Sequence, residues 1–468
     1  MKEHCEGLFN HMRRVINYRK SIFDTLEKRS GNHLWLTSSL RDVKKVIIIC
    51  SPSRSGSSML TAILKRMPGV YALSGEGTPF YKLNIFSLGT FPADERMAGV
   101  LFNQEHYSNL SRDFLSDLSV ACDQNNIFED NAMIERYIDD LALRFSLQWP
   151  LISFSYDLFK QLAAQAINAY RKKQENFCKE EFYLELLWFL RQEYGAINPY
   201  YYDIPENMIK KKFRGLNVPY GPPNKILTIE EPLFILLSPH GKVTYHDLSE
   251  HALLLKTTAD AYRMHLVESL FPGAQIKIIY LLRNPLGCIN GLYDGWLHRG
   301  FYSHNIEFFM NEKIPRAQRM LEIKGYSDRY AWGKRWWNYD LPPKWQEYTR
   351  KRLEDVCAFQ WYSAHNALQE YFIQSKKQYC LVRYENILKS QGAMMDEIGK
   401  IIDFIGASRG VLPHLGLDTL PITQATQIPQ PFRWRKRKDM LLPLLDDPLM
   451  FDACVRLGYN KDAFEEWS

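Results

Sequence analysis

The amino-acid sequence predicts an α/β fold in which a parallel sheet is flanked by helices and interrupted by large, mainly helical insertions. Short runs of apolar residues, several of them rich in Val and Ile, recur along the chain, which is typical of parallel strands buried on both faces. Most of these runs are followed by a loop and then by helical apolar spacing, the pattern of strand–loop–helix units. A chain of 468 residues that is 46% hydrophobic is long enough to bury a large core.

The expected elements alternate in the order that such units require. A helix over Glu6–Lys28 precedes the first strand and is expected to cover the sheet. The apolar runs predict strands at Lys44–Cys50, Val70–Leu73, Ala252–Thr258, Ile276–Leu282 and Tyr379–Glu385. Helical spacing predicts helices at Met59–Leu64, Ala261–Phe271, Leu286–Trp296, Leu353–Phe372 and Gln391–Ile405.

Two long segments lack a strand–loop–helix unit and are interpreted as insertions. The first has helical spacing at Leu110–Leu118, Ala132–Leu147, Asp157–Lys173 and Phe182–Tyr194. The second is rich in Trp and is either a packed aromatic cluster or the wall of an acceptor pocket. The expected division is an N-terminal helical segment (1–42), a discontinuous core (43–79, 251–300 and 351–468), a helical insertion or cap (80–250) and a Trp-rich insertion (301–350).

The loop Ser51–Ser58 joins the first strand to its helix and is small, polar and turn-forming. Backbone N–H groups at the start of a helix, together with the helix dipole, favour an anion there. The loop departs from the nucleotide-kinase pattern, because Ser57 stands where that pattern has its Lys. Arg54 precedes Gly56 instead, so the loop suits an anion such as a phosphosulfate. A Ser-rich turn without a ligand is the alternative interpretation.

Three further charged residues follow expected strands. Glu76 lies between two glycines just after the second strand, Lys256 ends an apolar run, and Arg283 follows the strand at Ile276–Leu282. In open α/β sheets, ligands bind beyond the carboxyl ends of the strands, so these side chains are expected near the loop. Glu76 is then either a catalytic base or a solvated carboxylate.

The basic run Arg433–Lys438 carries five cations and one Trp. It is a solvated charge run, a targeting signal or a clamp for a nucleotide phosphate. The net charge of +6 is modest for this length and does not indicate nucleic acid. The eight cysteines show neither a C-x-x-C pair nor zinc-ligand spacing, and the sequence shows no signal peptide or membrane span. We therefore expect a cytoplasmic protein without a metal site.

The loop Ser51–Leu60 resembles the 5′-phosphosulfate loop of sulfotransferases that use 3′-phosphoadenosine 5′-phosphosulfate (PAPS), and Leu281–Asn290 resembles their 3′-phosphate motif. Leu255-Lys-Thr, Phe271-Pro-Gly-Ala, Val382-Arg-Tyr-Glu and Leu457-Gly-Tyr follow family habits in the family's order, and the layout is most similar to the tyrosylprotein and bacterial branches. The resemblance covers about half of the chain and implies a parallel sheet like that of P-loop NTPases. One departure is Gly291, where the family usually carries Ser.

The resemblance implies a role for each matching residue. Glu76 would be the general base that takes the acceptor's proton. If Glu76 is not the base, His298 and His304, which lie just beyond the 3′-phosphate motif, are the next candidates. Arg54 and Lys256 would stabilise charge on the transferring and leaving groups. The donor would be held by Arg54, Ser55, Gly56, Ser57, Ser58 and Arg283. Because Gly291 replaces the family's Ser, Asn290 or the basic residues Arg433 and Arg435 are expected to hold the 3′-phosphate in its place.

The implied reaction moves a sulfuryl group to a hydroxyl or amine of a small molecule or natural product and leaves adenosine 3′,5′-bisphosphate. No nucleic-acid partner is expected. The alternatives are a P-loop kinase that uses ATP, against which Ser57 argues, and a non-catalytic nucleotide-binding module, against which Glu76 argues.

Overall fold

The computed structural model describes most of the chain. The described residues are 2–29, 32–87, 93–97, 103–120, 130–150, 155–173, 177–195, 197–200, 204–222, 229, 236–308 and 320–467. Parts of both predicted insertions, among them 121–129 and 309–319, lie outside these residues.

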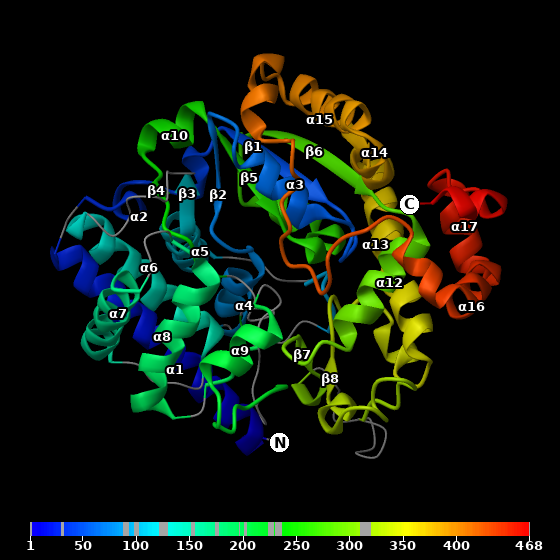
Figure 1. Cartoon of the computed structure of the whole chain (residues 1–468). Helices are drawn as coiled ribbons and strands as arrows, with labels where there is room; N and C mark the ends of the chain where they lie inside the picture. The colour runs from blue at the N-terminus through cyan, green and yellow to red at the C-terminus, as the bar shows by residue number, and fades with distance from the viewer. Residues whose placement is uncertain are drawn as a thin grey trace.

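A seven-stranded sheet lies at the centre of the described chain, with the strand order β4-β3-β2-β5-β1-β6-β9 (Figure 1). The strands from β2 to β9 in this order are parallel. At the other edge, β3 pairs antiparallel with β2, and β4 pairs antiparallel with β3. The bounds are β1 Lys45–Cys50, β2 Val70–Leu73, β3 Leu118–Val120, β4 Gly241–Lys242, β5 Ala252–Lys256, β6 Gln275–Leu282 and β9 Tyr379–Arg383. This arrangement confirms the predicted α/β class with a mainly parallel sheet.

Both faces of the sheet are covered by helices, which explains why its strands are continuously apolar. Ile47 and Ile49 of β1 face a core shared with α3 and α15, whereas Val46 and Ile48 face a core shared with α12 and α13. In Figure 1, α15 lies along the upper side of the sheet, and α12 and α13 lie on its other side. The helices are α3 Ser57–Leu64, α12 Pro285–Trp296, α13 Leu353–Ser375, α14 Tyr384–Lys389 and α15 Gln391–Ile405.

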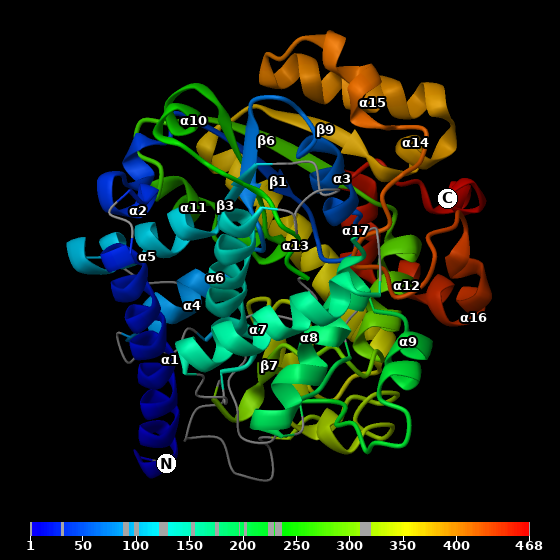
Figure 2. The same ribbon diagram turned by 60° about the vertical axis from the view of Figure 1, so that its left-hand side comes forward.

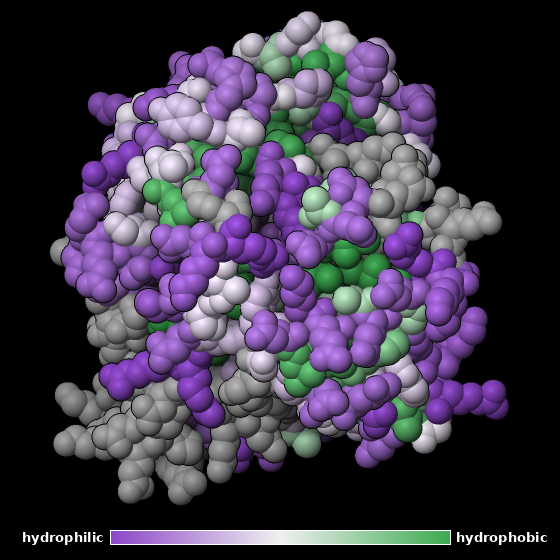
Figure 3. Space-filling view, turned by 90° about the vertical axis from the view of Figure 1, so that its left-hand side faces the viewer, coloured by the Kyte–Doolittle hydropathy of each residue, from purple (hydrophilic) through white to green (hydrophobic). Residues whose placement is uncertain are grey.

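The first insertion and the N-terminal helix form a helical layer with a core of their own beside the sheet. In Figure 2, α1 runs upright at the left of this layer, and α7 and α8 lie crosswise to its right. The outer face of the layer is mainly hydrophilic, with smaller hydrophobic areas between (Figure 3). Its helices, with the two that link it to the sheet, are α1 Lys2–Arg29, α4 Thr78–Ser87, α5 Gln104–Asp117, α6 Asn131–Gln148, α7 Tyr156–Arg171, α8 Lys179–Tyr194 and α9 Glu206–Lys212.

The structure differs from the sequence-based elements at three places. The range expected to be a helical insertion also supplies β3 and β4 to the central sheet. The helix expected at Ala261–Phe271 is a 3-10 turn followed by α11 (Met264–Ser269), because Arg263 leaves helical geometry between them and buries its guanidinium. The strand expected to reach Glu385 ends at Arg383, where α14 begins.

The C-terminal part packs beside α12 and α13, where Figure 1 shows it in red. The basic run folds as a 3-10 helix, Arg433–Arg437. The remaining helices and strands are α2 Leu34–Thr37, α10 Tyr245–Glu250, α11 Met264–Ser269, α16 Lys438–Leu441, α17 Pro448–Arg456, β7 His304–Asn305 and β8 Trp336–Trp337. Across the part of the chain that the structure describes, none of the helices combines the length and the apolar character that crossing a membrane requires.

Candidate active site

The loop between β1 and α3 forms a tight backbone cradle. Arg54 and Gly56 both have left-handed backbones, with φ values of 69° and 94°. A Cβ on Gly56 would lie 2.3 Å from Cε2 of Tyr384, so the approach of that ring requires glycine. No side chain caps the start of α3, which leaves its first N–H groups available to an anion.

A cavity of about 320 Å³ opens over this cradle at the carboxyl ends of the parallel strands. Of the residues predicted from the sequence, those that line it are Arg54, Gly56, Ser57, Ser58, Glu76, Lys256, Arg283 and Arg433. Four cations and one carboxylate from separate parts of the chain therefore share one cavity.

Arg283 is fixed beneath the cradle by two contacts. Its Nη1 donates to the carbonyl oxygen of Arg54 at 2.8 Å, and its guanidinium lies 4.5 Å from the centre of the Tyr384 ring. Its buried Nε has no hydrogen-bond acceptor among the described residues. A cation held this way, with a spare donor, is suited to binding an anion.

Glu76 and Lys256 form an ion pair at the ends of β2 and β5. The Lys256 Nζ donates to the Glu76 Oε1 at 2.5 Å, and the two side chains are 17% and 9% exposed. The loop around Glu76 is fixed because the N–H of Gly77 donates to the Thr257 hydroxyl and the N–H of Gly75 donates to the Asp117 carboxylate. A carboxylate that is bonded to an ammonium yet lines the cavity is suited to accepting a proton there.

Three predicted donor-binding side chains lie away from the cavity. Ser55 is fully buried, with its hydroxyl 3.6 Å from the Cys288 sulfur, so only its backbone is near the cradle. Asn290 is buried and accepts from Arg437 at 2.5 Å. Arg435 pairs with Glu465 on the outer side of the C-terminal part.

Asp294 on α12 collects the cations of the basic run that face inward. Its carboxylate accepts from Arg433 at 2.8 Å and from Arg437 at 2.6 Å. Arg437 was missed in the sequence, although the helical spacing from Asn290 to Asp294 puts both of its partners on one face of α12. Gly291 lies on the same helix, and a Cβ there would be 3.2 Å from the Cβ of Arg54, a close contact that a side chain at this position would have to accommodate.

The two histidines considered as alternative bases do not line the cavity. Burial lowers the pKa of His298 to about 4. His304 has its Nε2 3.3 Å from the Glu95 carboxylate. Although burial alone would raise the pKa of Glu95, hydrogen bonding to His304 and the charge of Arg263 lower it to about 2. Of these three residues, Glu95 is the one that lines the cavity.

The segment from Leu420 to Gln430 covers the cradle. The Arg54 guanidinium donates to the carbonyl oxygen of Gln424 at 2.6 Å, and the Ser58 hydroxyl donates to its side-chain oxygen at 2.5 Å. Gln424 itself has a left-handed backbone, with φ 51°. The neutral amide oxygens of Gln424 thus accept from Arg54 and Ser58, the two donors that the sequence analysis assigns to binding an anion.

The Trp-rich insertion supplies a third carboxylate to the cavity, Asp340, after Glu76 and Glu95. The Ser53 hydroxyl donates to its Oδ1 at 3.0 Å, and the Tyr262 hydroxyl donates to its Oδ2 at 2.7 Å. Burial raises its pKa to about 6. No motif marks this residue in the sequence, since its partners are distant along the chain.

Comparison with known proteins identifies the family. The family model described as "Sulfotransferase domain" matches residues 44–415. Similar solved structures include the "Sulfotransferase Domain from the Curacin Biosynthetic Pathway", at 12% identity over 89% of this chain and 99% of that chain, with a TM-score of 0.33. The "Sulfotransferase Domain from the Synechococcus PCC 7002 Olefin Synthase" is 12% identical over 90% of this chain and 96% of that chain, with a TM-score of 0.34. No curated protein matches the chain. Because the family model covers most of the chain and the strands that carry the cavity, this protein belongs to the sulfotransferase domain family, whose members are transferase enzymes.

Proposed function

We propose that the protein transfers a sulfuryl group from PAPS to a hydroxyl or amine of a small-molecule acceptor. The observation that carries the proposal is the meeting of Arg54, Arg283 and Arg433 with the Lys256–Glu76 pair in one cavity. These cations come from four chain segments, and cations that converge on one cavity attract an anion. A donor with a 5′-phosphosulfate and a 3′-phosphate would supply that anion.

The chain's residues fit such a donor in a specific way. The N–H groups at the start of α3 and the hydroxyls of Ser57 and Ser58 would hold the 5′-phosphate. Arg283 would hold the 3′-phosphate with the spare donor of its guanidinium, assisted by Arg433. Arg54 and Ser58 would exchange their contacts with Gln424 for oxygens of the donor.

The donor supplies the sulfuryl group: the sulfur–oxygen bond to its 5′-phosphate breaks as the bond to the acceptor oxygen or nitrogen forms, leaving adenosine 3′,5′-bisphosphate. Glu76 takes the acceptor's proton. Lys256 stabilises the negative charge that grows on the leaving phosphate, and Arg54 stabilises charge on the transferring group. Catalysis then rests on positioning and electrostatics.

The acceptor is proposed to enter from the side of the two insertions. Glu95 and Asp340 reach the cavity from these segments, together with Phe301 and Tyr339. The division into core and insertions, and the cytoplasmic location, stay predictions.

Thermal unfolding of the full chain with adenosine 3′,5′-bisphosphate, and separately with ATP and magnesium, tests the donor. A ligand of the native state at one hundred times its Kd stabilises by about 2.7 kcal/mol, so the bisphosphate should raise the Tm by a few degrees. A rise with ATP and magnesium but none with the bisphosphate would favour the kinase alternative and overturn the proposal.

A further inference from the structure

The turn Asn338–Asp340 is held in a strained conformation at the edge of the cavity. Tyr339 has a left-handed backbone, with φ 61°, which is unfavourable for a bulky residue. Its N–H donates to the Ser303 hydroxyl at 3.0 Å. Buried donors from Gln360 and Trp337 hold the carbonyl oxygen of Asp340 at 2.9 Å. Strain that persists because surrounding contacts enforce it is typical of functional sites.

The consequence of this turn is a fixed carboxylate in the cavity wall. Asp340 is 5% exposed, and both of its oxygens accept from hydroxyl groups. Within the described residues, Asp340 forms no ion pair with a Lys, Arg or His, whereas Glu76 pairs with Lys256 and Glu95 pairs with Arg263. Asp340 therefore differs from the other carboxylates of the cavity in lacking a cation from the protein.

Two chemically different groups of residues line the cavity. Arg54, Arg283 and Arg433 form a cationic group. Asp340 and the rings of Phe301 and Tyr339, whose centres are 4.3 Å apart, form the other group. A carboxylate beside aromatic rings attracts an ammonium group through a charge-assisted hydrogen bond and through cation–π contact.

We propose that the acceptor carries a basic amine in addition to the group that is sulfated, and that Asp340 binds this amine as an ammonium. The inference rests on the proposed function, because it takes Glu76 to mark the position of the reacting group. Asp340 is then a specificity-determining residue that selects cationic acceptors over neutral and anionic ones.

Three phenols of similar size test the proposal: tyramine, which is cationic, 4-ethylphenol, which is neutral, and 3-(4-hydroxyphenyl)propionate, which is anionic. Release of adenosine 3′,5′-bisphosphate from PAPS gives kcat/KM for each. Because a hydrogen bond to a charged group is worth about one to two decades of affinity, the wild type should prefer tyramine over 4-ethylphenol by ~10–100-fold. The propionate should be the poorest acceptor.

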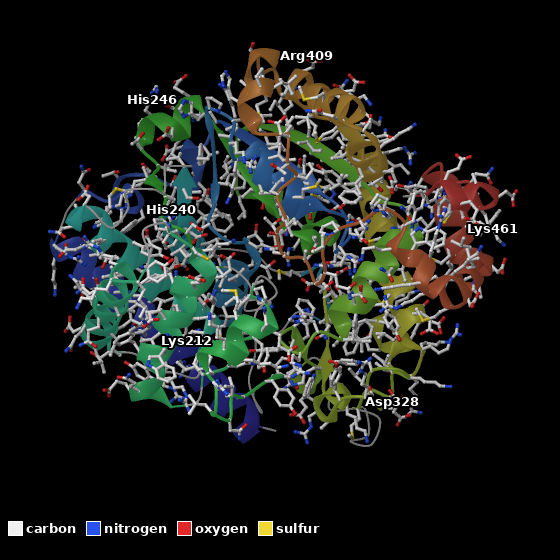
Figure 4. All side chains as sticks on the ribbon, in the orientation of Figure 1. Lys212, His240, His246, Asp328, Arg409 and Lys461 are labelled. Atoms are coloured by element: carbon white, nitrogen blue, oxygen red, sulfur yellow. The ribbon has the colours of Figure 1, made fainter. Side chains whose placement is uncertain are left out.

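Asp340→Asn keeps the shape of the side chain, and the preference for tyramine should fall to within about threefold. Asp328→Asn is the matched control: Asp328 is an exposed carboxylate of the same insertion, labelled at the lower edge of the molecule in Figure 4. This control variant should retain the wild-type preference. Equal use of the three phenols by the wild type, including use of none, overturns the proposal, and so does an Asp340→Asn variant that keeps the preference.

Calorimetric titration with adenosine 3′,5′-bisphosphate distinguishes failure of this proposal from failure of the proposed sulfuryl transfer from PAPS. Failure of the wild type to bind the bisphosphate refutes the proposed donor, whereas binding without charge preference refutes only the role of Asp340. If Asp340→Asn does not fold, the tyramine preference of Phe301→Leu is compared with that of the wild type instead. Phe301→Leu removes one aromatic ring and should reduce this preference severalfold, whereas an unchanged preference would count against the proposed ammonium site.

Discussion

Replacing Glu76 by Gln tests the proposed base with little change of shape. The amide cannot take the acceptor's proton, and general base catalysis contributes ~10²–10⁴-fold, so kcat should fall by that factor. The amide oxygen can still accept from Lys256, whose Nζ lies 2.5 Å from the Glu76 carboxylate. Loss of the ion pair leaves a Lys side chain that is only 9% exposed with a neutral partner, so stability should fall by about 1–3 kcal/mol.

Affinity for the donor product distinguishes loss of the general base from loss of the folded site. Removing a negative charge from a cavity that binds an anion should leave affinity for adenosine 3′,5′-bisphosphate unchanged or higher. The assay is bisphosphate release with the phenol that the wild type uses best, together with calorimetric titration. Glu322→Gln is the control, because this carboxylate is 56% exposed and, within the described residues, its ion pair is with Arg350 at 3.5 Å. A Glu76→Gln variant that turns over within threefold of the wild type would refute the reasoning and make Asp340 the next candidate base.

Three further predictions concern the cradle and its surroundings. Arg283→Ala should weaken bisphosphate binding by about one to two decades in calorimetry. Arg409→Ala should not, because Arg409 is an exposed cation, labelled at the top of Figure 4, that does not line the cavity; equal affinities of the two variants would place the 3′-phosphate elsewhere. Gly56→Ala should lower the Tm and abolish bisphosphate binding because its Cβ meets Tyr384, and a wild-type Tm with normal binding would contradict this. Burial raises the pKa of Asp340 from 3.8 to about 6, so its ionisation destabilises the folded protein as pH rises between these values. The Tm of Asp340→Asn relative to wild type should therefore increase from pH 4 to pH 7, by the equivalent of at most about 3 kcal/mol. A difference in Tm that does not depend on pH would contradict this prediction.

The sequence was sufficient for the core of the fold because the parallel strands are buried on both faces. A short apolar run that is followed by a loop and a helix is interpreted as a buried parallel strand, so these strands are recognisable in the sequence. By contrast, Gly241–Lys242 carries no apolar pattern and becomes a strand only by pairing with Leu118–Val120. The helix expected at Ala261–Phe271 is broken for a similar reason, since Arg263 pairs with Glu95, which is distant in the sequence.

The candidate site was predictable where it follows strand ends and was not predictable where it depends on side-chain direction. Glu76, Lys256 and Arg283 follow strands whose carboxyl ends meet at one edge of the sheet. The basic run is a 3-10 helix with three residues per turn, so Arg433 faces α12 while Arg435 faces Glu465. A run of cations in the sequence does not show which of them turn inward.

Backbone strain offers a signal that the sequence alone does not contain. Arg54, Tyr339 and Gln424 have left-handed backbones although none is glycine, and all three line the cavity. They come from the cradle, the Trp-rich insertion and the covering segment, so no local sequence preference unites them. Each such conformation costs of order 1–3 kcal/mol and is kept only where other contacts enforce it. Three distant segments therefore bear this cost at one cavity, and the proposed roles of Arg54 and Asp340 depend on that common position.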